Sequence, residues 1–117
     1  MKEEKFKVLQ FIREFIVRVE KELESFPKKD VEIKQKIRKN VYDLLEIMYE
    51  ANITENISKK TDLIEKSLAK IKLIDFLINL SYDKELIAQK RYIKLSEKLD
   101  DIVKYISGLL KKVNNRA

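Results

Sequence analysis

Basic side chains recur at helical spacing in the second half of the chain. Lysine and arginine neutralise phosphates and release their counterions, so such stripes predict nucleic-acid binding that depends strongly on salt. Two sets each share one sector of a helix drawn at about 100° per residue: Lys59, Lys66 and Lys70 in one segment, and Lys84, Arg91, Lys94 and Lys98 in the next. Tyr92 beside Arg91 is either a stacking platform for a base or a core or interface tyrosine.

The charge balance agrees with a polyanion partner. The 117 residues carry 26 Lys and Arg against 20 Asp and Glu, a formal net charge of +6. Residues 1–56 hold twelve of each sign, whereas residues 83–117 hold nine basic and five acidic side chains. No motif for reading a base sequence is present. The alternative interpretation is that a lysine-rich composition simply solubilises long helices.

Catalytic and metal-binding groups are scarce. The chain has no His, no Cys and one Gly, which removes the commonest general base, thiolate ligands and any glycine-rich phosphate loop. A bundle di-iron site needs Glu-x-x-His pairs. Two groups of carboxylates at helical spacing are interpreted as solvated faces that pair with lysines: Asp43, Glu46 and Glu50, and Glu97, Asp100 and Asp101. We therefore expect no enzyme activity, no metal and no cofactor.

Apolar residues follow helical spacing along the whole chain. They predict four helices near residues 4–25, 31–51, 57–80 and 84–113. Pro27 breaks the first helix, Asp30 is a candidate N-cap of the second, and Asn56 or Ser58 of the third. Because short connections make successive helices antiparallel neighbours, the fold class is all-α. We expect one domain, residues 1–117, folded as an up-down-up-down four-helix bundle.

The apolar surface exceeds what one bundle needs. Val8, Phe11 and Val17 lie off the main stripe of the first helix, and residues 73–80 are apolar nearly all round. Such surfaces suggest contacts between subunits, although a wide core stripe is the alternative. The candidate interface residues are Phe11, Phe15, Phe76 and Leu80.

The N-terminus and the hydropathy predict where the protein acts. A charged start, MKEEK, lacks the apolar core of a signal peptide. No uninterrupted apolar stretch approaches the roughly 20 residues of a membrane span. We expect a cytoplasmic protein without a membrane partner.

Several ordered segments carry a family resemblance. They are residues 42–52 (YDLLEIMYEAN), 68–74 (LAKIKLI), 80–87 (LSYDKELI), 90–92 (KRY), 96–102 (SEKLDDI) and 107–109 (SGL). In order and spacing, this set resembles the accessory variability determinant (Avd) proteins of diversity-generating retroelements, over roughly residues 25–112. Gly108 matches a glycine of that family, and we interpret it as a site of close helix packing.

The resemblance implies a four-helix bundle assembled into a homopentameric barrel. Its partners would be the element's reverse transcriptase and RNA or DNA, and its role would be to support error-prone copying of a template RNA into cDNA, without chemistry of its own. The family commonly has two basic residues one turn apart on helix three. Lys72 matches the first and Phe76 replaces the second, so any contact with the polymerase at this point must differ. The family's Gly-Gly-Trp ending and Asp-Glu-Ile-Gly pattern are also incomplete.

A second family shares the bundle and the barrel. The proteins encoded in intervening sequences of 23S ribosomal RNA genes also have a Phe-Pro-Lys turn, as at residues 26–28, and an Ala-Asn segment, as at residues 51–52. They usually continue with a Glu-Gly-rich link, which is absent here. We therefore favour the Avd resemblance. The alternative is a stand-alone bundle oligomer with a structural or RNA-associated role and no polymerase partner.

Overall fold

Long helices make up nearly all of the computed structural model, which describes residues 2–116 and the side chains of residues 7–115. Within these bounds lie four α-helices and one short 3-10 helix, and no strand: α1 (Lys2–Leu23), η1 (Lys28–Asp30), α2 (Val31–Ile53), α3 (Ile57–Asp83) and α4 (Gln89–Arg116). The expectation of an all-α chain with four long helices is confirmed. No helix in the described part of the chain is both long and apolar enough to cross a membrane.

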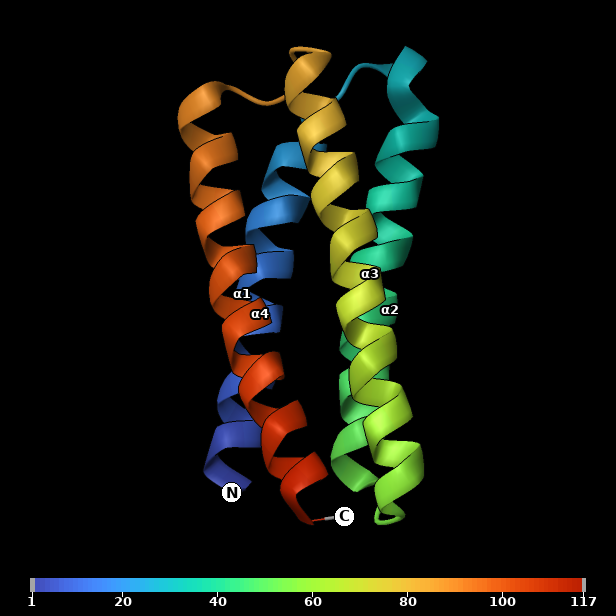
Figure 1. Cartoon of the computed structure of the whole chain (residues 1–117). Coiled ribbons are helices and arrows are strands. Elements are labelled where there is room, and N and C mark those ends of the chain that lie inside the picture. Colours follow the sequence, from blue (N-terminus) through green and yellow to red (C-terminus); the bar gives the residue numbers. More distant parts are fainter. Residues whose placement is uncertain (1, 117) are drawn as a thin grey trace.

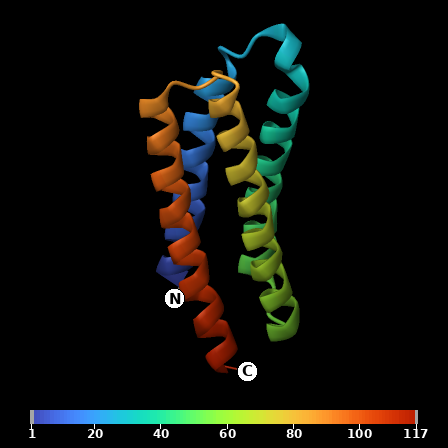
Figure 2. The same cartoon turned by 45° about the horizontal axis from the view of Figure 1, so that its top comes forward.

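The helices form a bundle in which each packs against two others. Contacts join α1 to α2, α2 to α3, α3 to α4 and α4 back to α1. Figure 1 shows the α1–α2 and α3–α4 connections at one end, with the α2–α3 connection and both ends of the described chain at the other, and Figure 2 shows the same arrangement from a tilted view. The longest dimension of the bundle is 47 Å, which suits helices of up to 28 residues rising about 1.5 Å per residue.

The core runs along the bundle axis and takes apolar residues from every helix. They recur three or four positions apart, as in Ile12, Phe15 and Val19 of α1 or Leu99, Ile102 and Ile106 of α4. Each fully buried side chain of this kind stabilises the fold by about 1.5–3 kcal/mol relative to exposure. The core therefore accounts for the helical periodicity of the sequence.

Phe15 belongs to this core and not to an interface. Its side chain is 0% exposed, so the expectation that it contacts another subunit is wrong. The cause is its position on the stripe of α1 that faces the other three helices. Phe11, one turn earlier, is half-buried and meets the ring of Tyr105 edge-on, with ring centroids 5.2 Å apart.

The first two connections follow the predicted breaks. Pro27 is extended and α1 already ends at Leu23, two residues earlier than expected. Asp30 precedes α2, but its carboxylate makes no capping hydrogen bond, so its predicted capping role is wrong. The Asp30 side chain is buried instead, and its Oδ1 lies 3.0 Å from Lys84 Nζ. Asn56 does cap α3, since its Oδ1 accepts a 2.9 Å hydrogen bond from the Lys59 amide.

The third connection is longer than predicted. Helix α3 continues to Asp83 and α4 begins only at Gln89, so the expected start at residue 84 is wrong. Glu85 has a φ of 63°, which a right-handed helix excludes. The Leu86 amide donates to the Ser81 carbonyl, and Ile87 is buried, which fixes this turn against the bundle.

Gly108 lies in an open position on α4. A Cβ atom built on it would meet no other atom within 4 Å, and the residue is exposed. The interpretation that this glycine permits close packing between helices of one bundle is therefore wrong.

Candidate nucleic-acid interface

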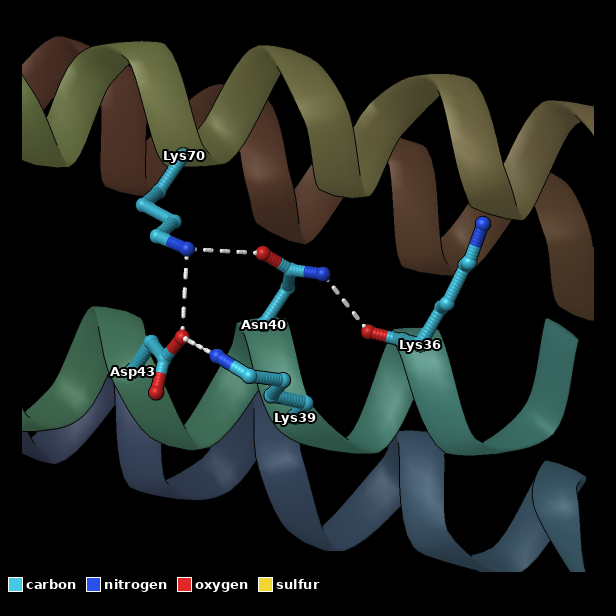
Figure 3. A network of polar contacts seen from close by, with 5 residues as sticks. All are labelled: Lys36, Lys39, Asn40, Asp43 and Lys70. Carbon is cyan, nitrogen blue, oxygen red and sulfur yellow. Dashed lines mark hydrogen bonds and ion pairs between the residues drawn. The ribbon is translucent and has the colours of Figure 1, made fainter. Parts of the chain in front are cut away.

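Lys70 holds α3 against α2. Its Nζ donates to Asn40 Oδ1 at 2.9 Å and lies 3.1 Å from Asp43 Oδ2, and the side chain is only 23% exposed (Figure 3). Lys39 lies 2.8 Å from the same carboxylate oxygen of Asp43. Hydrogen bonds from Lys39 and Lys70 hold the pKa of Asp43 below its ordinary value. The charge of Lys70 is thus used within the bundle.

Asn40 completes this polar contact from a buried position. Its Nδ2 donates to the Lys36 carbonyl at 2.7 Å while its Oδ1 accepts from Lys70, as Figure 3 shows. Both ends of the amide are therefore satisfied. Because a buried polar group without a hydrogen-bond partner is costly, this contact favours one alignment of α3 along α2.

The remaining predicted cations are scattered over the bundle. Lys59, Lys66 and Lys72 are exposed on α3 and pair with no carboxylate among the described side chains. Lys84 sits in the α3–α4 connection, where it pairs with Asp30. Lys70 points to α2, whereas Arg91, Lys94 and Lys98 of α4 line a concavity with α1. The two predicted stripes therefore do not form one surface.

A groove between α1 and α4 gathers three of the predicted cations of α4, which are Arg91, Lys94 and Lys98. Its volume is about 640 Å³, and it is lined by five cations, two carboxylates and two aliphatic residues: Arg18, Lys21, Arg91, Lys94 and Lys98, with Glu14, Glu22, Val17 and Leu95. We call this the α1–α4 groove. It holds an excess of three positive charges within one concavity, which raises the local concentration of an anionic ligand.

Most of the cations in the α1–α4 groove are available to a ligand. Arg18, Lys21, Lys94 and Lys98 pair with no carboxylate in the described part of the chain, and only Lys98 is half-buried. Arg91 differs, because its Nε donates to Glu22 Oε1 at 3.0 Å. From Arg91 to Lys98 the groove extends about 10 Å along α4, at about 1.5 Å per residue.

Sequence reasoning missed Arg18 and Lys21, since they lie in the half of the chain with no net charge. The signal was their spacing of three residues, which places both on one face of a helix. The nearby acid Glu20 points elsewhere: it accepts hydrogen bonds from Arg38 (2.7 Å from Nη2) and from the Tyr42 hydroxyl (2.9 Å) on α2. Hydrogen bonding from Arg38 lowers the pKa of Glu20. Its charge is therefore compensated away from the groove.

Tyr92 of α4 is half-buried and packs against α3. Its ring stacks on Tyr82 with centroids 4.5 Å apart and planes 8° apart, and its hydroxyl accepts a hydrogen bond from Asn79 Nδ2. Of the two interpretations of this tyrosine, the structure favours a packing role over a platform for bases. The α1–α4 groove has no aromatic residue in its lining.

Phe76 and Leu80 belong to a second concavity, between the end of α3 and the start of α2. It measures about 430 Å³, and basic side chains such as Lys29 and Lys36 surround its apolar wall. Phe76 is 59% exposed, whereas Leu80 is half-buried. Phe11 is not part of this lining, so the candidate interface residues do not share one surface.

The described side chains include no group of three or more His, Cys, Asp or Glu residues that could hold a metal ion. No protein-family model matches the chain, and neither a curated protein nor a solved structure matches it. The role of the α1–α4 groove is therefore inferred from the charges and contacts of its own residues.

Proposed function

We propose that this protein is a non-catalytic accessory protein that binds nucleic acid in the α1–α4 groove and serves the reverse transcriptase of a diversity-generating retroelement. The observation that carries the nucleic-acid part is the excess of five cations over two carboxylates in one groove. The ordered segments that resemble Avd proteins carry the polymerase part. Each phosphate held in the groove releases counterions, which favours binding without reading a sequence.

In this proposal the helices of each bundle are antiparallel, and five copies of the bundle assemble into a homopentamer. An oligomer would present several copies of the groove to one strand, which raises the apparent affinity without any new contact. The exposed ring of Phe76 and the apolar wall around it supply a surface that a second copy or the polymerase could cover. In this account the protein delivers the template RNA and its cDNA to the polymerase in the cytoplasm.

Co-purification tests the polymerase part. The tagged chain is expressed with a reverse transcriptase whose gene lies beside its own, and the complex is isolated at moderate salt. We expect a complex of the enzyme with several copies of this chain, and light scattering of the chain alone should give about five times its 14.0 kDa mass. A stable single-chain species that captures no polymerase would reject the proposal. An oligomer that binds RNA but no polymerase would instead favour the stand-alone bundle of the 23S intervening-sequence type.

A further inference from the structure

Among the described side chains, Arg91 is the one cation of the α1–α4 groove that has an anionic partner. Its Nε donates to Glu22 Oε1 at 3.0 Å, and the Glu22 side chain is 14% exposed against 59% for Arg91. Water screens an ion pair less when one partner is largely buried. Within the side chains that the structure describes, the groove therefore contains four unpaired cations and one that is paired with its own chain.

We infer that the α1–α4 groove takes the phosphodiester backbone alone, and that Glu22 competes with a phosphate for Arg91 and so limits affinity. The inference rests on the proposed nucleic-acid function and deepens it. Glu22 is a positioning residue for Arg91 that also acts as an internal substitute for a phosphate.

The lining of the groove explains the restriction to the backbone. It contains only charged and aliphatic side chains, so no aromatic ring is present on which a base could stack. Reading the base edges of a duplex requires an element that enters one of its grooves, and a concavity between two helices cannot do so. Along one strand of a duplex, phosphates follow at about 3.4 Å of axis each, so a groove of about 10 Å spans about three such intervals and reaches about four phosphates.

The geometry of the pair sets the competition. A phosphate that approaches Arg91 also approaches the Glu22 carboxylate, and the two negative charges repel. Binding at this position must displace Glu22 or tolerate that repulsion. Removing the charge of Glu22 leaves Arg91 as a fifth free cation.

Glu14 provides a matched control in the same groove. Its carboxylate accepts a hydrogen bond only from the neutral amide of Gln10, at 3.4 Å, and no cation of the described side chains pairs with it. Glu14→Gln and Glu22→Gln therefore change the net charge equally. Only the second releases an arginine.

Fluorescence anisotropy on the full chain measures the effect. The probes are a labelled 20-nucleotide single-stranded RNA and a labelled 20-base-pair DNA duplex, titrated at several salt concentrations. We expect Glu22→Gln to tighten binding to at least one probe by roughly five-fold, and to steepen the dependence of log K on log salt by about 0.9 for duplex or about 0.7 for single strand. Glu14→Gln should change affinity by less than about two-fold.

A double-mutant cycle removes the ambiguity of a single variant. Arg91→Gln leaves Glu22 unpaired in the groove and should weaken binding, and adding Glu22→Gln should restore affinity to within about two-fold of the unmodified chain. Equal effects of Glu14→Gln and Glu22→Gln on both probes would overturn the inference while the nucleic-acid function stands. Failure of the unmodified chain to bind either probe would reject the nucleic-acid function itself.

Discussion

Replacing Lys70 by methionine separates a structural lysine from a ligand-binding one. The change keeps the aliphatic stem but removes the donor to Asn40 Oδ1, 2.9 Å away, and to Asp43 Oδ2, 3.1 Å away. Asn40 is 7% exposed, so its oxygen loses its partner in a place that water scarcely reaches. Asp43 keeps Lys39. A buried unsatisfied acceptor costs about 1–3 kcal/mol, and the surviving ion pair of Asp43 limits the total to about 1–2 kcal/mol.

Urea unfolding followed by circular dichroism measures this loss, with nucleic-acid anisotropy in parallel. At this chain length, 1 kcal/mol corresponds to about 3–6 °C in Tm. Lys66→Met is the matched control, because Lys66 lies one turn away on the same helix and is exposed without a carboxylate partner among the described side chains. We expect Lys70→Met to lower stability and leave affinity within about two-fold, and Lys66→Met to leave stability unchanged. Equal stability of the two variants would refute the reasoning.

Three further predictions concern stability. The pKa values of Glu20 and Asp43 lie below their ordinary values because Arg38 donates to the first, and Lys39 and Lys70 to the second. Their charged forms therefore add stability above about pH 5, and this stability is lost as the pH falls through about 4 and below. Glu20→Gln should make the urea midpoint depend less on pH across this range. Phe15→Ala should cost about 3–5 kcal/mol because the ring is fully buried within one bundle. In dilute, dissociated chains, Phe76→Ala should cost under about 0.5 kcal/mol, and equal costs in urea unfolding there would contradict this assignment of core and surface. Gly108→Ala should raise stability by about 0.5–1 kcal/mol, because the added Cβ meets no atom within 4 Å in the bundle. A lower Tm for the variant would contradict the open position of this residue.

Local patterns in the sequence predicted the helices because the signals that define them are local. Apolar spacing sets the buried face of each helix, Pro27 marks the first break, and Asn56 caps α3 through a partner three residues away. The start of α4 was predicted five residues too early. Glu85 has a left-handed backbone that interrupts the helix, and Ile87 in the same turn is buried against the bundle. No residue near this turn signals that contact in the sequence.

The candidate site was predicted only in part, since a groove depends on which helix faces are adjacent. The spacing grouped Arg91, Lys94 and Lys98, which line one groove, but it also included Lys84, which precedes α4 and pairs with Asp30. It could not show that Arg18 and Lys21 of α1 line the opposite wall of the groove. For the same reason, the sequence could not show that Lys70 pairs with residues of α2 and is not available to a ligand.

The salt dependence of nucleic-acid affinity tests the central claim most directly. Four unpaired cations in the α1–α4 groove predict a slope of log K against log salt of about −3.6 per groove on duplex DNA, at about 0.9 per phosphate contact. Lys94→Gln combined with Lys98→Gln should reduce that slope by about 1.8. The paired change of Lys59 and Lys66 to glutamine, which removes the same charge from exposed positions on α3, should leave it nearly unchanged. A slope near zero, or equal losses in the two double variants, would contradict the groove as the nucleic-acid site.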